Sequence, residues 1–371
     1  MASKVVALIL AGGKGTRLEY LTKKIAKPAV SFAAKYRIID FPLSNCANSS
    51  IHKVGVCTQY ESTLLDSYLG NGEKWGLNGN RSLLSVLAPR QTEEGAAWYR
   101  GTADAIYQNI DWIDSQEADY VLILSGDHIY KTSYSDMINQ HIETGASATI
   151  SVIPVPMEEA SRFGIMETDE TGRIVKFQEK PKEPKSNLAS MGVYVFTWKK
   201  LRKYLKDDAN NENSSHDFGK NIIPALLKDK HKLFAYTYKG YWKDVGTIAS
   251  LHEANMDVAL GRGGLDLYSH EGGRIYTEDT HSVPHYVGRK ADVKRSIVNQ
   301  GAIVLGKIDT CVVSAQVTIE EGAVLKNCVV MSGAIIHSGA KINNAIIAPE
   351  VEIEAKRQIN LDSDEVVLIS K

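Results

Sequence analysis

Short apolar runs alternate with segments of helical periodicity from Val5 to about Asp257. The apolar runs are rich in Val and Ile and are bounded by Gly or polar residues, as in strands buried on both faces. We predict such strands at Val5–Leu10, Val54–Thr58, Tyr120–Leu124 and Ala148–Val152. Strands that alternate with helices favour a layered α/β sheet with right-handed crossovers, whose ligand site lies beyond the carboxyl ends of the strands.

Two segments between these strands have the periodicity of helices. Residues 102–115 place Ile106, Ile110 and Ile113 on one stripe, which predicts a single amphipathic helix. Residues 133–143 begin with Ser133, a residue type that often caps helix N-termini, so we predict that the second helix starts there.

The pattern changes at the glycine-rich run 260–264, which we interpret as the start of a linker. Beyond about Tyr286, short β-rich pieces follow a six-residue beat, at Val324, Val330, Ile336 and Ile342 and in a second set at Val329, Ile335, Ile347 and Ile353. A hexapeptide period is typical of a parallel β-helix, in which each coil buries its inward aliphatic residues against the next coil. An ordinary antiparallel β domain is the alternative. We predict boundaries at 1–260, 261–285 and 286–371.

Length, charge and cysteine content narrow the class of protein. A chain of 371 residues is long for one core, so two domains are expected. The formal charge is -1 and no like-charged block is long, which predicts neither a nucleic-acid nor a membrane partner. The four cysteines form no CxxC pair, and the only early apolar run is short, so we expect a cytoplasmic protein without structural zinc or disulfides.

A glycine-rich loop, residues 10–18, follows the first predicted strand. Gly12, Gly13 and Gly15 leave their N–H groups free to form a concave anion site, and Lys14 and Arg17 add positive charge. The loop is neither a Walker P-loop, because no GK[ST] closes it, nor a dinucleotide fingerprint, because a leucine stands in place of the third glycine. A phosphate-binding loop is favoured over a plain turn.

Two aspartates are candidates for binding magnesium. Asp127 follows the strongest predicted strand, and Asp244 lies in a turn before a predicted helix. Mg²⁺ prefers one or two carboxylates together with phosphate oxygens, and it binds where parallel strands end. Either residue alone could equally cap a helix. We interpret His128 as a packed neighbour of Asp127 and not as a base.

The loop and a series of further segments together resemble the bacterial glucose-1-phosphate adenylyltransferases. These segments occur in order over the first 260 residues: AKPAV at 26–30, KYRIIDF at 35–41, WYRGTADA at 98–105, SGDHIY at 125–130, SRFG at 161–164, EKP at 179–181, LASMG at 188–192 and YWKDVGT at 241–247. The resemblance implies a Rossmann-like (GT-A-like) mixed-sheet nucleotidyltransferase domain and a C-terminal left-handed parallel β-helix. It also implies the Mg²⁺-dependent synthesis of ADP-glucose, for glycogen, from ATP and glucose 1-phosphate.

The resemblance assigns roles to particular positions. For ATP it implies Gly12, Gly13, Lys14, Gly15, Thr16, Arg17 and Lys27, with Gln91 near the adenine. For glucose 1-phosphate it implies Tyr99, Gly164, Glu179, Lys180 and Ser190, and for magnesium it implies Asp127 and Asp244. Arg17, Asp127 and Lys180 are the expected catalytic residues.

The chemistry agrees with these roles. A phosphate monoester has a second pKa of about 6, so the substrate phosphate is already ionised and can attack the α-phosphorus without a general base. The barrier lies in bringing two polyanions together, which requires Mg²⁺, Lys, Arg and aimed N–H groups.

Other assignments stay open at this point. A non-catalytic regulatory subunit would have the same fold, but it would be expected to lose loop or metal residues that this chain keeps. An enzyme using UTP or dTTP is a second alternative, because base selection depends on pocket shape. The resemblance implies a homotetramer, and a heterotetramer with a related subunit is possible.

The segment from residue 24 to residue 37 departs from the usual family pattern. Ala33-Ala34 stand where a Gly-Gly pair is common, and alanine adopts positive φ less readily than glycine, so we expect this loop to be ordered differently. Ile25 stands where many members have a basic residue. Lys24 and Arg37 remain as a candidate effector site.

We therefore predict that fructose 1,6-bisphosphate stimulates this protein weakly or not at all, because the candidate effector site at residues 24–37 carries less positive charge than is usual in the family. Initial rates with and without the effector test this. A rate increase of about tenfold or more, which corresponds to roughly 1.4 kcal/mol of barrier, would contradict the prediction.

Overall fold

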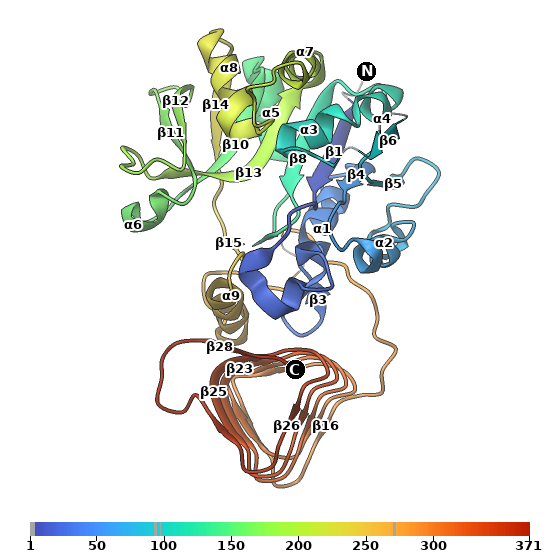
Figure 1. Ribbon diagram of the computed structural model, residues 1–371, viewed down its shortest axis with the longest axis vertical. Coiled ribbons are helices and arrows are strands. Elements are labelled where there is room, and N and C mark those ends of the chain that lie inside the picture. Colours follow the sequence, from blue (N-terminus) through green and yellow to red (C-terminus); the bar gives the residue numbers. More distant parts are fainter. Residues whose placement is uncertain (1–3, 93–94, 97, 270–271) are drawn as a thin grey trace.

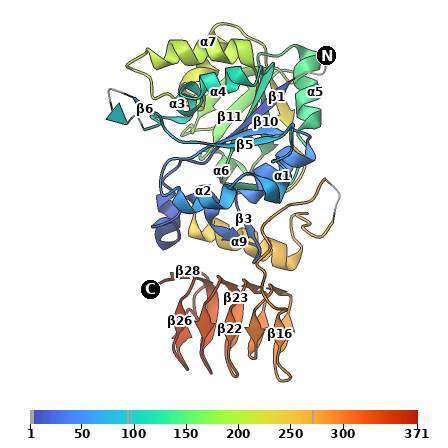
Figure 2. The same ribbon diagram turned by 90° about the vertical axis from the view of Figure 1, so that its right-hand side faces the viewer.

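The protein is described here from a computed structural model, which covers residues 4–92, 95–96, 98–269 and 272–371. An α/β part with a large sheet lies above a triangular β-helix, and α9 (Ile248–Leu260) lies between them (Figure 1). The coils of the β-helix stand side by side when the molecule is turned (Figure 2). Among the described residues, no helix is both long and apolar enough to span a membrane.

The large sheet is mixed, and its central strands are parallel. β5 (Leu83–Leu87), β4 (Lys53–Cys57), β1 (Val5–Leu10) and β8 (Tyr120–Ser125) lie in this order and run in the same direction. β13 (Leu188–Thr197) pairs antiparallel with β8 and connects the centre to β10 (Ala148–Pro154), β11 (Gly164–Thr168), β12 (Ile174–Glu179) and β14 (Leu233–Thr237). The predicted α/β sheet is confirmed. Leu10 pairs with Ser125, so the glycine loop and the Asp127 turn leave the sheet at the same edge.

Helices cover this sheet on both faces. They are α1 (Asp40–Asn48), α2 (Thr63–Leu69), α3 (Thr102–Tyr107), α4 (Ile110–Ser115), α5 (Ser135–Thr144), α6 (Met157–Ala160), α7 (Trp198–Ala209) and α8 (Ile223–Lys228). The single helix predicted over 102–115 is wrong: it is divided at Asn109, whose side-chain amide donates to the carbonyl of Ala105 (2.8 Å) and to the hydroxyl of Tyr99 (3.0 Å). An asparagine that bonds to neighbouring groups in this way competes with helix continuation.

The predicted cap of α5 is also wrong. The helix begins at Ser135, and its N-cap residue Tyr134 makes no side-chain capping bond. The Ser133 hydroxyl instead accepts from the Ser135 amide (3.3 Å), in a local turn that precedes the helix.

The β-helix stacks short parallel strands on three sides. One side has β16 (Tyr286–Val287), β19 (Ile303–Val304), β22 (Thr318–Ile319), β24 (Ile335–Ile336) and β26 (Glu352–Ile353). The others are formed by β17 (Asp292–Lys294), β18 (Ile297–Val298), β20 (Lys307–Asp309), β21 (Val312–Val313), β23 (Val324–Val330), β25 (Lys341–Ile347), β27 (Gln358–Ile359) and β28 (Val367–Ile369). Val304, Ile319, Ile336 and Ile353 stack as one buried column.

Two positions of the predicted six-residue beat do not point inward. Val324 is 38% exposed and Ile335 is half-buried. Val324 pairs with Lys341 and Ile335 pairs with Glu352, so both belong to outward-facing columns. Their partners Lys341 and Glu352 are both polar. The six-residue period of the sequence therefore does not coincide everywhere with the positions that face the interior of the coils.

The β-helix and the α/β part share one apolar cluster, to which α9 contributes Leu251 and Ala254. His252 of α9 bonds through Nε2 to the carbonyl of Asn327 (2.7 Å), and the Asn299 amide donates to the carbonyl of Ala34 (3.0 Å). The β-helix is thus fixed both against α9, which begins four residues after Asp244, and against the turn at Ala34.

The two alanines that replace the usual glycines both adopt left-handed backbone, with φ of 49° at Ala33 and 66° at Ala34. The Asn255 carboxamide accepts from the Ala33 amide (2.9 Å), and Asn299 holds Ala34. A left-handed non-glycine residue costs roughly 1–2 kcal/mol, so these tertiary contacts stabilise a conformation that the residues disfavour.

The segment before the β-helix lies along one face of α1. Asp40, Ser44 and Asn48, which are spaced four residues apart, bond to Thr277, Tyr276 and Arg274. Asp40 is fully buried, and this burial raises the pKa of its carboxyl to about 6 despite hydrogen bonds from the Arg37 amide, Thr277 and Tyr68. A polar stripe therefore holds the connecting segment in place.

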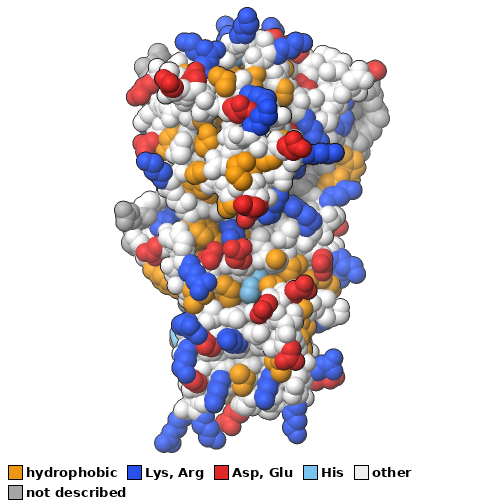
Figure 3. Space-filling model, turned by 90° about the vertical axis from the view of Figure 1, so that its left-hand side faces the viewer, with side chains coloured by type: hydrophobic (Ala, Val, Ile, Leu, Met, Phe, Trp, Pro, Cys, Tyr) orange, Lys and Arg blue, Asp and Glu red, His pale blue; other side chains and the backbone are white. Residues whose placement is uncertain are grey.

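Basic and acidic side chains are interspersed on the face seen in Figure 3, and neither sign forms a continuous surface there. This distribution agrees with the formal charge of -1.

His337 links successive coils of the β-helix. Its Nδ1 lies 3.0 Å from Glu320 and its Nε2 lies 2.6 Å from Glu352, and hydrogen bonds to these carboxylates raise the pKa of the imidazole. Because the folded pKa is above the unfolded value of about 6.5, the stabilisation is complete below that value and is lost as pH rises through the folded pKa.

His337→Gln should therefore lower the melting temperature at about pH 6 and have a smaller effect at about pH 9. The measurement is thermal unfolding across this range, with the exposed His285→Gln as the control. A temperature difference that does not change with pH would refute the charge contribution.

Candidate functional site

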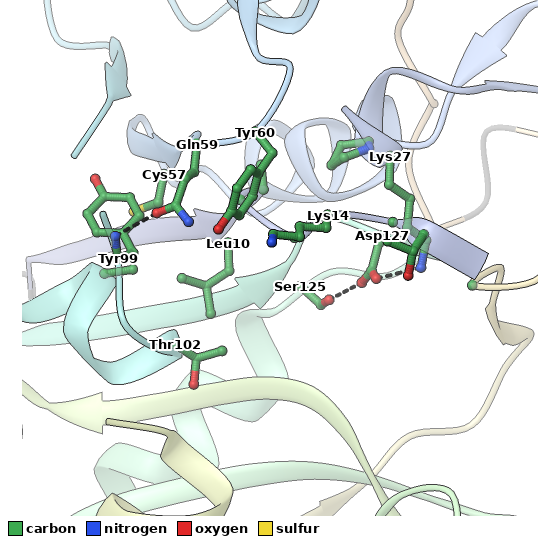
Figure 4. A pocket seen from close by; sticks show the side chains of 18 of the residues that line it. Leu10, Lys14, Lys27, Cys57, Gln59, Tyr60, Tyr99, Thr102, Ser125 and Asp127 are labelled. Carbon is green, nitrogen blue, oxygen red and sulfur yellow. Dashed lines mark hydrogen bonds and ion pairs between the residues drawn. The ribbon is translucent and has the colours of Figure 1, made fainter. Parts of the chain in front are cut away.

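A cleft of about 570 Å³ opens at the carboxyl edge of the central strands. Its lining includes Leu10, Gly12, Gly13, Lys14, Gly15, Thr16, Arg17, Lys27, Gln59, Tyr60, Tyr99, Gly101, Thr102, Ser125, Asp127 and Gly246. Figure 4 shows Lys14 and Lys27 on the same side of this space as Asp127. The predicted phosphate loop and the first predicted metal ligand therefore share one cavity.

The glycine loop is shaped by close packing on one side and open space on the other. A Cβ at Gly12 would lie 3.1 Å from Cβ of Gln59, whereas a Cβ at Gly13 would have no neighbour within 4 Å. Gly15 has φ of 61°, a left-handed conformation that favours glycine. The loop thus presents bare backbone to the cleft.

Aromatic rings form one wall of the cleft. The Lys14 ammonium lies 5.0 Å from the centre of the Tyr60 ring, and Tyr60 stacks on Trp98 at 5.1 Å with 12° between the planes. A cation over a ring is stabilised by about 0.5–1 kcal/mol at an exposed site, a modest gain that a phosphate could outcompete.

Asp127 and Asp244 converge on a single cation. The Lys27 ammonium lies 2.5 Å from Oδ2 of Asp127 and 3.4 Å from Oδ1 of Asp244. β9 (His128–Tyr130) and β15 (Trp242–Asp244) pair in antiparallel register, with His128 opposite Asp244, which brings the two distant segments together. Lys27 is only 5% exposed, so its charge is directed at these carboxylates.

The electrostatic environment keeps Asp127 ionised. Burial by itself would raise the pKa of Asp127, but the charges of His128 and Lys27 and hydrogen bonds from Lys27 and Ser125 hold that pKa well below its usual range. A carboxylate that stays ionised near neutral pH is suited to bind a hard cation.

The same corner brings together three side chains that could hold a metal ion. One ligand atom each from Asp127, His128 and Asp244 lies within 4.8 Å of the others. Two carboxylates suit Mg²⁺, and His128 was not among the predicted ligands. The His128 ring packs edge-on against Trp242, and its Nδ1 is buried without a hydrogen-bond partner among the described residues.

Gly246 completes this corner. A Cβ there would lie 2.7 Å from Nη2 of Arg17 and 2.9 Å from Oδ1 of Asp244. The missing side chain therefore leaves room for the Arg17 guanidinium beside the Asp244 carboxylate.

A second group of predicted residues lies on β11, β12 and β13. Gly164 pairs with Glu179, and a Cβ at Gly164 would lie 2.9 Å from Oε2 of that residue. Ser190 lies 3.4 Å from the hydroxyl of Tyr194. Gly192 lies next to the corner that contains Asp127 and His128. A Cβ at Gly192 would lie 3.5 Å from both His128 and Ser125.

Lys180, which the resemblance implies for the sugar phosphate, lies largely at the surface. Its side chain is 65% exposed and its ammonium lies 3.9 Å from Oε1 of Glu179. The backbone is left-handed, with φ of 47°, and the amide donates to the carbonyl of Phe163 (3.0 Å). The protein alone does not enclose this ammonium.

Comparison with known proteins identifies the family. Residues 6–260 match the nucleotidyl transferase family and residues 280–366 match the GlmU-like C-terminal hexapeptide family. The glucose-1-phosphate adenylyltransferase of Geobacillus stearothermophilus is 53% identical over 326 residues, which cover 88% of this chain and 84% of that protein. That of Bacillus thuringiensis (strain Al Hakam) is 50% identical over 370 residues, covering 99% of this chain and 98% of that protein.

The chain belongs to the glucose-1-phosphate adenylyltransferase family. The resemblance inferred from the motif series is thereby confirmed, and so are the nucleotidyl transferase class of the first part and the hexapeptide β-helix class of the second.

Within this family site, the structure brings most of the predicted nucleotide residues together. Gly12, Gly13, Lys14, Gly15, Thr16, Arg17 and Lys27 line the cleft with Asp127. The side chain of Gln91 lies outside the described residues. Tyr99 also lines this cleft, where its hydroxyl donates to the carbonyl of Leu87 (2.9 Å), whereas the other predicted sugar-phosphate residues do not line it.

Asp217 and Gly219 were not predicted. A Cβ at Gly219 would lie 2.4 Å from Oε2 of Glu179, and burial together with the charge of Asp217 raises the pKa of the Glu179 carboxyl. Asp217 accepts from the amides of Gly219 and Lys220. An aspartate just before a helical run is a capping signal that could have located it.

The candidate effector residues lie apart from the cleft lining. Lys24 is exposed. The Arg37 guanidinium lies 4.5 Å from the centre of the Tyr68 ring and donates to the carbonyl of Ala29 (2.7 Å). Arg37 is therefore partly engaged in intramolecular contacts.

Proposed function

We propose that this chain transfers the adenylyl group of ATP to glucose 1-phosphate, forming ADP-glucose and pyrophosphate for α-glucan synthesis. The observation that carries the proposal is the convergence of Asp127 and Asp244 on one cation beside a glycine-lined cationic cleft. Its support from outside the structure is the high identity to glucose-1-phosphate adenylyltransferases over nearly the whole chain.

On the nucleotide side, the glycine loop would hold the phosphates through its backbone N–H groups. Lys14, Arg17 and Lys27 would offset their negative charge, and Lys14 would leave the Tyr60 ring to do so. Fixed cations and N–H dipoles that face the developing charge lower the barrier without reorganising.

Asp127 and Asp244 would hold a magnesium ion, with His128 as a neighbouring third donor. Bound there, the ion would supply positive charge to the nucleotide phosphates. The Lys27 ammonium lies close to both carboxylates. It would give up part of this contact and turn toward a phosphate.

On the sugar side, Glu179, Ser190 and the backbone at Gly164 would position glucose 1-phosphate, and Lys180 would pair with its phosphate. An oxygen of that phosphate attacks the α-phosphorus of ATP. The bond from the α-phosphorus to the oxygen that bridges the α- and β-phosphates breaks, and that oxygen leaves with pyrophosphate. No proton has to be removed, because the attacking phosphate is already ionised near neutral pH.

We further propose a cytoplasmic tetramer made of a catalytic domain at 1–260, a linker at 261–285 and a left-handed β-helix domain at 286–371. The end of α9 at Leu260 and the start of β16 at Tyr286 support these bounds.

Pyrophosphate release with each of ATP, UTP and dTTP and with several sugar 1-phosphates tests the function. We expect ATP and glucose 1-phosphate to give the highest kcat/KM. Preference for a pyrimidine nucleotide would replace the assignment, and no turnover with any pair would favour a regulatory subunit.

Lys180→Ala should raise the KM for glucose 1-phosphate by roughly tenfold to a hundredfold, because a cation that pairs with the substrate phosphate is lost. Steady-state kinetics measure this, with the exposed Lys182→Ala as the matched control. An unchanged KM would refute the role of Lys180.

A further inference from the structure

A buried histidine behind the proposed sugar site belongs to no part of the chemistry described above. His216 is 4% exposed and its backbone is left-handed, with φ of 52°. Its Nδ1 lies 2.8 Å from Oδ2 of Asp208 at the end of α7. A left-handed histidine is a strained conformation, which persists only where surrounding contacts determine it.

The contacts around His216 hold it from two directions. The Ser214 hydroxyl donates to Oδ1 of Asp208 (2.6 Å) and accepts from the His216 amide (2.9 Å). On the other side, the His216 carbonyl accepts from the amides of Ala103 (2.8 Å) and Asp104 (3.4 Å), in the first turn of α3. The turn at His216 is therefore fixed between α7 and α3.

Gly101 makes this approach possible. A Cβ there would lie 2.3 Å from the His216 carbonyl oxygen and 2.5 Å from that of Ser215. Gly101 and Thr102 also line the nucleotide cleft, so the turn at His216 lies directly behind a wall of that cleft.

The residues after His216 face the proposed sugar site. Oδ2 of Asp217 accepts from the Thr102 hydroxyl (3.0 Å), which in turn accepts from the Phe218 amide (3.0 Å). The π-helix η4 (Phe218–Ile222) follows and places Gly219 against the Glu179 carboxylate. A rotation at His216 would therefore move Asp217 and Gly219 relative to Glu179.

From this geometry we infer that His216, held by Asp208, is a positioning residue that acts through Asp217 and Gly219 and sets the sugar-phosphate site against the nucleotide cleft. The inference rests on the proposed function, because it takes Glu179 as a residue that contacts the sugar phosphate. His216 itself touches neither substrate in this assignment.

The test compares variants of His216 by steady-state kinetics and thermal unfolding. His216→Ala loses the bond to Asp208 and disfavours left-handed backbone, so the KM for glucose 1-phosphate should rise by roughly tenfold or more. The KM for ATP should change by less than about threefold, because the glycine loop is not displaced.

Two further variants separate the bond from the backbone conformation. His216→Asn tolerates left-handed backbone and can still donate to Asp208, so it should restore most of the sugar-phosphate affinity. His216→Gly can adopt the left-handed backbone but cannot bond to Asp208, so it should restore little of the affinity for glucose 1-phosphate. His231→Ala, which removes a partly buried histidine bonded to Ser147, is the control and should leave both constants unchanged.

Some outcomes would overturn the inference. These are equal rises in both KM values, a lower melting temperature with unchanged KM values, or full restoration by His216→Gly. If His216→Ala does not fold, the near-isosteric Asp208→Asn carries the same test. If the parent prefers another nucleotide, the proposed function fails, but the difference between the sugar-phosphate and nucleotide constants still tests His216.

Discussion

The site depends on holding two carboxylates close together. Donor atoms of Asp127 and Asp244 lie within 4.8 Å of each other, and two like charges at that distance repel by roughly 3–4 kcal/mol at an effective dielectric constant of about 20. The buried Lys27 offsets this repulsion, since its ammonium contacts both carboxylates. A cation beside the pair therefore lowers its energy, which supports the magnesium ion that we propose for this corner.

Several neighbouring features hold these charged side chains close together. The β9–β15 pairing aligns His128 with Asp244, and Gly246 leaves room for the Arg17 guanidinium. Lys27 lies just before a hairpin whose turn contains Ala33 and Ala34, and that turn is held by Asn255 and Asn299. Contacts from α9 and from the β-helix thus stabilise a strained hairpin that directly follows the segment carrying Lys27.

The β-helix also supports the candidate site. α9 begins with a capping box formed by Thr247 and Ser250, and Thr247 lies three residues beyond Asp244. The far side of α9 packs on the β-helix core. His252 adds a direct bond to Asn327. Docking of the β-helix therefore restrains the segment that carries Asp244, one of the two carboxylates that contact Lys27.

The sequence by itself determined the elements with strong periodicity and the family. The buried strands, the glycine loop and the ordered motif series were all visible, because each depends on residues close together in the chain. It missed the break at Asn109, the serine turn before α5 and the outward positions of Val324 and Ile335. In each case the local sequence pattern predicted a different structure, because it does not encode the hydrogen bonds of particular side chains or the alignment of one β-helix coil with the next.

Only the tertiary structure decided which side chains meet. Asp127 and Asp244 were predicted as two magnesium ligands from their positions in the sequence, and the resemblance implied the same pair. Their sharing of Lys27, the place of His128 beside them, and the approach of Asp217 and Gly219 to Glu179 depend on contacts between distant segments. Sequence spacing encodes neighbours along a strand or helix, whereas distances across a cleft follow from the packing of the whole sheet.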